Sequence, residues 1–191
     1  MARAGVTVER LTRAAAELAD EVGFDNVTVT ALARRFGVKE GSLYSHVRNM
    51  RDLRVRVALL ALEELADRAG EALAGRSGKD ALVAFANAYR DYAKRHPGRY
   101  AATRLRLEPE EAASGAGARH VELNRAILRG YRVPESDHVD AIRLLGATFH
   151  GFVSLETAGS FAHSRSVRSE DASWAKILDT LHFTLSHWPA S

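Results

Sequence analysis

Apolar residues recur at steps of three and four positions along most of the chain, which is the period of a helix with one buried face. In the first such helix the stripe consists of Val8, Leu11, Ala15, Leu18 and Val22. Alternating β-branched residues, the mark of a strand, are confined to positions 27–30. The pattern therefore predicts an all-α protein of about nine helices, over residues 8–22, 29–36, 40–47, 50–74, 80–95, a short segment around 100–105, a stretch ending near 130, 137–162 and 171–188.

Two of these expected helices, 29–36 and 40–47, are short and closely joined. Helices connected by so few residues cross steeply, which calls for a small residue where they touch and a left-handed backbone angle in the turn. Ala33 and Gly37 stand at these two positions. The spacing is typical of a DNA-binding helix-turn-helix, and a generic helical hairpin is the alternative.

The positive charge of the chain is concentrated around this segment. The net charge of +3 is a weak indication by itself, but residues 34–56 contain seven basic and two acidic side chains. Such a basic surface suits the phosphates of a nucleic acid, whereas an ordinary solvated helix face is the alternative. The local charge therefore favours DNA binding.

A specific sequence surrounds the turn. Residues 23–36 read GFDNVTVTALARRF, and residues 37–46 continue as GVKEGSLYSH. Over about fifty residues, from Leu11 to Leu60, the chain resembles the N-terminal domain of TetR-family repressors. The resemblance implies a helix-turn-helix DNA-binding domain at residues 1–50 and a larger helical domain for ligand binding and dimerisation at residues 51–191.

The resemblance also implies which side chains meet DNA. Tyr44 and His46 match positions that contact DNA, while the start of the second short helix faces the major groove and the start of the first reaches a phosphate or base edge. For Tyr44 and His46, plain packing or exposure is the alternative. The implied DNA-binding residues are Thr28, Thr30, Lys39, Glu40, Gly41, Ser42, Tyr44, Ser45, His46, Arg48 and Arg51.

Two residues depart from the family pattern. Many members have a lysine where this chain has Met50, so Arg48 or Arg51 is expected to take over its phosphate contact. Glu40 is an acid on the expected reading face, where it either accepts a hydrogen bond from a cytosine amine or disfavours nonspecific binding. The base preference does not follow from the sequence.

Two apolar stripes near the C-terminus predict a dimer. Small side chains at helical spacing allow a close approach of a second helix, and the last helix carries a long apolar stripe. Pairs of these helices from two chains would form a four-helix bundle, as is usual for TetR-family dimers. The residues expected at this interface are Ala147, Gly151, Ser154, Ala158, Trp174, Leu178, Leu181 and Leu185.

The sequence around His150 resembles the WHG-type C-terminal domain of some TetR-family regulators, although Phe149 replaces the usual tryptophan. The resemblance implies an unidentified small-molecule effector. Pockets for such ligands are mostly apolar with a few polar groups, and aromatic residues at helical spacing are alternatively plain core. The expected ligand-binding residues are Phe85, Tyr89, Tyr92, Tyr100, Arg104, Asn124, Phe149, His150 and Phe152.

Composition and motifs count against other classes of protein. There is no cysteine, which excludes disulfides, cysteine-ligated metals and thiol nucleophiles. The histidines lack metal-ligand spacing, and the motifs of di-iron bundles, phosphate loops and nucleophile elbows are missing. We therefore expect no enzyme activity, no cofactor and no metal. Without a long apolar run or a secretory signal, no membrane association is expected and the cytoplasm is the expected compartment.

Taken as a whole, the sequence predicts a homodimeric, ligand-responsive transcriptional regulator. We expect it to act as a repressor that a small molecule releases from a near-palindromic double-stranded DNA operator. The alternative is a helical small-molecule-binding protein whose helix-turn-helix is degenerate and does not bind DNA. Salt-dependent binding to duplex DNA would distinguish the two.

Overall fold

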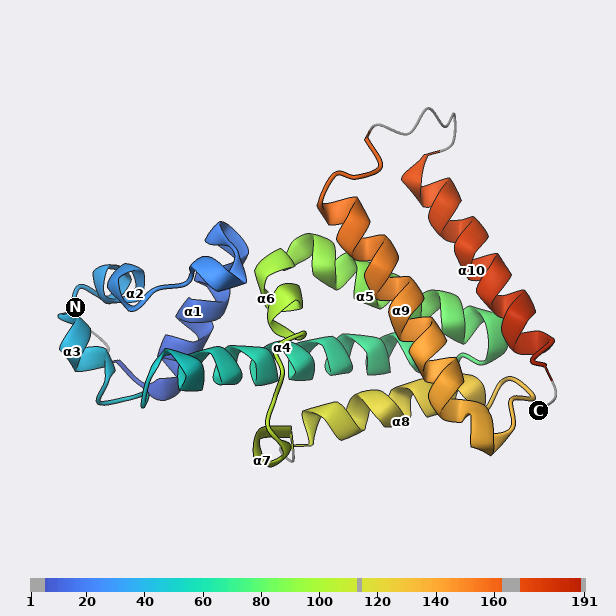
Figure 1. Ribbon diagram of the computed structural model, residues 1–191, viewed down its shortest axis with the longest axis horizontal. Helices are drawn as coiled ribbons and strands as arrows, with labels where there is room; N and C mark the ends of the chain where they lie inside the picture. The colour runs from blue at the N-terminus through green and yellow to red at the C-terminus, as the bar shows by residue number, and fades with distance from the viewer. Residues whose placement is uncertain (1–5, 113–114, 163–168, 190–191) are drawn as a thin grey trace. The chain divides into compact units, whose positions relative to one another are not determined.

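The computed structural model describes residues 6–112, 115–162 and 169–189. These residues fold into α-helices and two short 3₁₀ helices, without strands, which confirms the all-α prediction (Figure 1). The α-helices are α1 (Val8–Val22), α2 (Val29–Phe36), α3 (Glu40–Leu43), α4 (Met50–Leu73), α5 (Gly78–Arg95), α6 (Pro97–Ala102), α7 (Pro109–Ala112), α8 (Ala116–Leu128), α9 (His138–Thr157) and α10 (Glu170–Ser186).

Most helix boundaries lie within a few residues of those that the sequence predicts. The additional helix is α7, a single turn that begins at Pro109, a residue read from sequence only as a boundary. The helix α3 ends at Leu43 rather than 47, where the His46 amide bonds to the Leu43 carbonyl oxygen three residues back, as in a turn, instead of to Ser42 four residues back. Similarly, α9 stops at Thr157, and the chain turns at Gly159 with φ of 69°.

The chain forms two compact units. Unit 1 consists of Met1–Glu64 and Arg95–Ala116, and unit 2 consists of Leu65–Lys94 and Gly117–Ser191. Each unit has its own cluster of buried apolar side chains. The boundary predicted after residue 50 separates a DNA-binding domain from a ligand-binding domain, whereas the two units are separated by their internal contacts. The predicted domain boundary therefore stays a prediction.

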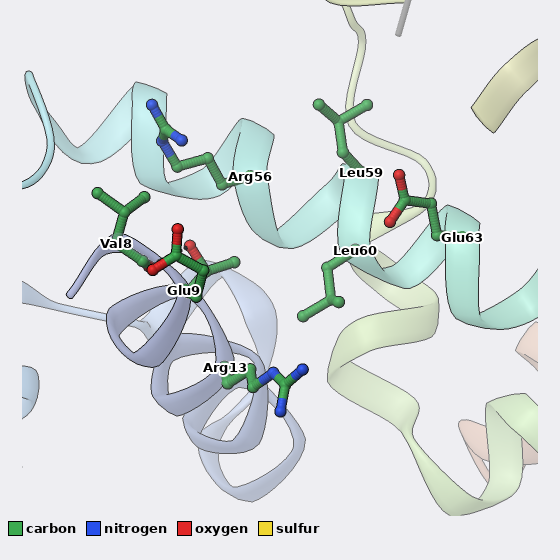
Figure 2. A pocket seen from close by; sticks show the side chains of 8 residues that line it. Val8, Glu9, Arg13, Arg56, Leu59, Leu60 and Glu63 are labelled. Atoms are coloured by element: carbon green, nitrogen blue, oxygen red, sulfur yellow. Dashed lines mark hydrogen bonds between the residues drawn. The ribbon is translucent and has the colours of Figure 1, made fainter. Parts of the chain in front are cut away.

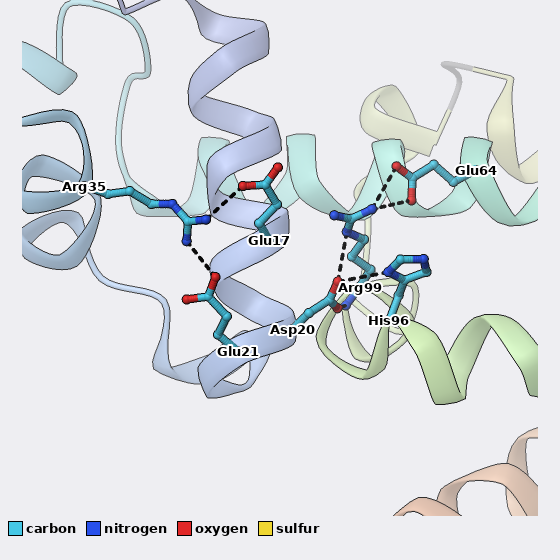
Figure 3. Close-up of polar contacts among 7 residues, drawn as sticks. All are labelled: Glu17, Asp20, Glu21, Arg35, Glu64, His96 and Arg99. Carbon is cyan, nitrogen blue, oxygen red and sulfur yellow. Dashed lines mark hydrogen bonds and ion pairs between the residues drawn. The ribbon is translucent and has the colours of Figure 1, made fainter.

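The core of unit 1 is formed by α1 together with α2, α3, α6 and the first turns of α4. Leu11, Leu32, Leu43 and Leu53 are almost fully buried there. The helix α6 is also held by charge, because Oδ1 of Asp20 on α1 accepts a hydrogen bond of 2.9 Å from the backbone amide of Arg99. The Arg99 guanidinium reaches both Asp20 (3.1 Å) and Glu64 of α4 (3.2 Å), as Figure 3 shows.

The core of unit 2 is formed mainly by α5, α8, α9 and α10, with aromatic rings at its centre. Phe85, Phe149 and Trp174 are all buried, and the Phe149 and Trp174 ring centroids lie 5.9 Å apart. A buried ion pair accompanies them: Arg90 of α5 donates through Nε and an Nη nitrogen to the Glu156 carboxylate of α9. Charge and aromatic packing therefore both join α5 to α9.

No helix within residues 6–112, 115–162 and 169–189 combines the length and the apolar character that a membrane span requires.

Candidate functional site

The helix-turn-helix predicted from sequence is present in unit 1. The helix α2 begins as expected, since the Thr28 hydroxyl caps it by accepting a hydrogen bond of 3.2 Å from the Ala31 amide. At its other end Gly37 adopts the left-handed conformation (φ 65°, ψ 36°), which side chains with a β-carbon rarely adopt. Ala33 is buried and the amide of Val38 bonds back to its carbonyl oxygen, so the turn is tight. The geometry is that of two short helices held at a fixed angle.

The residues predicted to bind DNA lie on the outside of this motif. Ten of the eleven residues are exposed, and His46 is half-buried. Tyr44 follows the last residue of α3 directly and is 50% exposed, so its ring and hydroxyl are accessible. The apolar residues of the same segment, Leu43 and Val47, point instead into the core. The segment therefore separates a packing face from a polar, accessible face.

The two threonines on α2 and its cap use their hydroxyl groups in opposite ways. Thr28 accepts from a backbone amide, so its own proton remains available to a phosphate oxygen. Thr30 donates its proton to Oε1 of Glu40 at 2.7 Å. Thr28 can thus serve as a donor to the DNA backbone, whereas Thr30 is occupied within the motif.

The structure also distinguishes the two arginines that might replace a lysine at Met50. Arg51 donates to the backbone oxygen of Arg106 and to Glu111, both at 2.9 Å, which holds the segment around α7. The guanidinium of Arg48 has no partner among the described residues. Met50 packs against the core of unit 1, which accounts for an apolar residue at that position. Arg48 is consequently the better candidate for the phosphate contact.

Some of the basic charge around the motif is neutralised within the chain. Arg35 donates to Glu17 and Glu21 of α1, each at 2.9 Å (Figure 3). Arg56 pairs with Asp52. The cations left to face a polyanion are therefore fewer than the sequence count indicates, and they include Arg48 and Lys39.

The residues predicted to bind a ligand are only partly brought together. Phe85, Tyr89, Phe149 and Phe152 belong to the aromatic core of unit 2 or pack against it. Tyr92 is fully buried beneath the guanidinium of Arg68, 5.1 Å from the ring centroid.

Two other predicted ligand residues do not belong to this unit. Tyr100 and Arg104 lie in unit 1, where Tyr100 is buried and Arg104 is exposed. The prediction places these two residues in one ligand site with the other seven, and the structure corrects this grouping. The position of a short helix between two longer ones in the sequence does not show which unit it packs into. Asn124 and His150 are half-buried in unit 2, and each hydrogen-bonds within its own helix.

Sequence reasoning missed one polar group at the aromatic core. The hydroxyl of Tyr89 lies 2.6 Å from Nδ1 of His120 on α8, and the two rings meet edge to face with centroids 6.0 Å apart. Thirty-one residues separate the two, and no spacing within either helix indicates the pairing. The pair gives the aromatic cluster a further site that can exchange hydrogen bonds, in addition to the Arg90–Glu156 ion pair.

The predicted dimer residues divide into two groups. Ala147 on α9 and Ala158 directly after it are exposed, and a β-carbon on Gly151 would meet nothing within 4 Å, so the small-residue face is open. On α10, by contrast, the structure corrects the prediction, because the apolar stripe closes the core of its own chain and offers no surface to a partner. These buried residues are Trp174, Leu178, Leu181 and Leu185.

The exposed face of α10 carries other side chains. Phe183 is 62% exposed and stacks on His187 with ring centroids 4.2 Å apart. On the neighbouring helix α9, Leu155 is 49% exposed. These apolar groups, rather than the buried stripe, are available to a second copy of the chain.

Unit 1 contains a recess of about 290 Å³ between α1 and α4. Val8 and Glu9 contribute from α1, and Arg56, Leu59 and Leu60 contribute from α4, as Figure 2 shows. None of the residues predicted to bind a ligand lines it. The recess has apolar walls and charged groups at its rim, and it lies apart from the exposed face of the helix-turn-helix described above.

Comparison with known protein families shows to which family this chain belongs. Residues 11–57 match the family model described as bacterial regulatory proteins of the tetR family, and residues 82–181 match a tetracyclin repressor-like C-terminal domain. The chain belongs to the TetR family. This TetR-family protein is therefore a transcriptional regulator with an N-terminal DNA-binding helix-turn-helix, as the sequence motif predicts.

Individual relatives agree with this assignment. The HTH-type transcriptional regulator Rv0681 of Mycobacterium tuberculosis is 36% identical over 155 residues, which cover 79% of this chain and 70% of that protein. The fold of a single-residue variant of TetR from Acinetobacter baumannii in complex with minocycline matches with a TM-score of 0.69 at 24% identity, covering 98% and 100% of the two chains. BioQ with its double-stranded DNA operator matches with a TM-score of 0.64 at 23% identity, covering 93% and 99%.

Proposed function

We propose that this TetR-family protein is a homodimeric repressor that binds a near-palindromic operator and is released by a small molecule. The observation that carries the proposal is the separation of faces in the helix-turn-helix: Tyr44, Lys39 and Ser42 are exposed while Leu43 and Val47 are buried. An α-helix presented in this way fits the major groove, where its first turn reaches base edges. The structural neighbour BioQ is seen with its DNA operator, which supports the same use of the fold here.

The proposed dimer follows from the geometry of DNA. Two recognition helices enter successive major grooves when they lie about 34–36 Å apart, or one further turn along the duplex. A symmetric pair of chains meets this requirement with an inverted-repeat operator. The open face of α9 and the exposed Phe183 of α10 supply the surface that we assign to the contact between protomers.

The proposed effector binds unit 2, in the region of the aromatic core. The neighbour TetR is seen with minocycline, which shows that a relative of this fold holds a small organic molecule. A ligand that prefers a dimer with another separation of its recognition helices lowers DNA affinity, and coupling of about 1–3 kcal/mol changes affinity roughly 5- to 150-fold. A repressor of this kind needs no catalytic activity. We expect it in the cytoplasm, because its proposed operator DNA lies there.

Selection of purified protein against a random pool of duplex DNA tests the proposal. Enrichment of an inverted repeat, lost as the salt concentration rises, is the expected result, because each phosphate contact releases counterions. The same duplex then serves to screen small molecules for release. A protein that enriches no sequence at low salt would instead be a small-molecule-binding protein with a degenerate helix-turn-helix.

A further inference from the structure

A hydrogen bond joins the two helices of the helix-turn-helix on their exposed side. The hydroxyl of Thr30, in the first turn of α2, donates to Oε1 of Glu40, the first residue of α3, at 2.7 Å. Both side chains are exposed. The bond restrains the Glu40 carboxylate at the point where α3 begins.

The partner of Glu40 differs from that of many acidic residues of unit 1. Within the described part of this unit, six acidic side chains each pair with an arginine: Glu17, Asp20, Asp52, Glu21, Glu64 and Glu111. Glu40 instead meets a neutral hydroxyl, which orients the carboxylate without cancelling its charge. Its second oxygen, Oε2, has no partner among the described residues. The pair thus presents a charged hydrogen-bond acceptor to whatever approaches α3.

An ionised carboxylate accepts hydrogen bonds and cannot donate them, so the partners that DNA offers it are few. Phosphate oxygens repel it. In the major groove the donors are the N4 amine of cytosine and the N6 amine of adenine. The adenine amine is flanked by acceptors on both sides, N7 of the same base and O4 of the paired thymine, whereas the cytosine amine has an acceptor on one side only, O6 of guanine. The carboxylate therefore favours cytosine.

We propose that Glu40, positioned by Thr30, selects cytosine at one base pair of each operator half-site. This inference rests on the proposed function, since it concerns how the same helix-turn-helix reads its operator. It assigns Thr30 a role different from a phosphate contact, because its proton is already donated within the protein. Lys39, adjacent to Glu40 and exposed, supplies attraction to the phosphates that offsets the acid.

The test is selection from a random duplex pool with the full-length wild-type, E40Q, T30V and T30S proteins, read by sequencing. For the wild type we expect cytosine at one symmetric position, preferred about 5- to 20-fold over other bases. E40Q should lose this preference, since an amide can also donate and so tolerates other bases. T30V should weaken it while leaving other positions of the motif unchanged, and T30S, which keeps the hydroxyl, should restore it.

A matched control separates base reading from simple charge. E63Q removes one negative charge from α4 in the same unit and should leave every base preference as in the wild type. If E40Q raised affinity for all duplexes and kept the wild-type motif, Glu40 would act only by repulsion and the proposal would be wrong. If the wild type enriched a motif without a symmetric cytosine, the inference alone would fail. If it enriched nothing, the proposed function would fail with it.

Discussion

No side chain fits between Gly98 and the backbone of Ala19. A β-carbon built on Gly98 would lie 1.9 Å from the carbonyl oxygen and 2.1 Å from the carbonyl carbon of Ala19. Gly98 is in the first turn of α6, and Ala19 is near the end of α1. The two helices consequently meet backbone to backbone, and the ion pair between Asp20 and Arg99 lies beside this contact.

We therefore expect Gly98→Ala to destabilise unit 1 strongly. The obstacle is backbone rather than a flexible side chain, so α6 must move away from α1, and the expected loss is about 2–3 kcal/mol or more. Urea unfolding at a fixed protomer concentration measures it. Gly117→Ala is the control, because Gly117 lies in α8 with nothing within 4 Å of an added β-carbon. That variant should be neutral or slightly stabilising, and an equal loss in both would show that close approach is not the cause.

The buried pair Arg90 and Glu156 should dominate the charge contribution to the stability of unit 2. Removing one partner leaves the other buried with less compensation, although Arg90 keeps its contact with Asp171 at 2.8 Å. Glu156→Gln is expected to cost about 2–4 kcal/mol in unfolding free energy. The exposed pair of Glu122 and Arg125 provides the control, since Glu122→Gln should change stability by less than about 1 kcal/mol. Similar losses in the two variants would contradict the prediction.

The same pair predicts how stability depends on pH. Hydrogen bonds from Arg90, and then from Lys94, hold the pKa of the Glu156 carboxyl below its ordinary value of 4.5 despite its burial. Because the pKa is lowered in the folded chain, the stabilisation by the ionised Glu156 carboxylate is complete above about pH 4.5. This stabilisation is lost as the pH falls through the lowered pKa of the folded chain. The difference in unfolding free energy between wild type and Glu156→Gln should therefore shrink below pH 4.5. A difference that stayed constant from pH 7 to pH 3 would show that folding does not lower the pKa of Glu156.

Much of the helix-turn-helix follows from local sequence. The cap at Thr28, the left-handed Gly37 and the bounds of α2 all depend on residues close together in the chain, and each agrees with its prediction. The early end of α3 does not, because a tight turn and a further helical turn differ here only in whether the His46 amide bonds to the carbonyl oxygen of Leu43 or to that of Ser42. Local propensity is too weak to decide between them.

Long-range pairing is where the sequence is silent. Tyr89 with His120 and Arg90 with Glu156 are separated by 31 and 66 residues, and nothing in the spacing of one helix selects such a partner. The stripe of α10 shows the same limit: periodicity reveals an apolar face but not whether it meets the same chain or another. Trp174 and Leu178 of this stripe are buried in the core of their own chain.

Tyr44→Ala should weaken DNA binding strongly and leave the fold intact. Half of the Tyr44 side chain is exposed, so its loss should change unfolding free energy by less than about 1 kcal/mol. DNA affinity should fall about 10- to 100-fold or more, because a phenol on the reading face can donate to a phosphate. Fluorescence anisotropy with the selected duplex measures the affinity, and Tyr44→Phe isolates the hydroxyl. If Tyr44→Ala also unfolded or dissociated the protein, Tyr44 would be a packing residue.

Phe183→Glu should convert the dimer to monomers without unfolding either unit. The ring is 62% exposed on α10, which packs against α9, so it contributes little to the core of its own chain and can offer apolar area to a second copy. Placing two carboxylates across a symmetric contact adds repulsion to the lost burial. Sedimentation equilibrium should show a dissociation constant raised at least about tenfold, with unchanged far-UV circular dichroism. Val121→Glu is the control, since Val121 on α8 is 41% exposed and outside the proposed contact. Dissociation by Val121→Glu but not by Phe183→Glu would place the dimer contact on α8 instead.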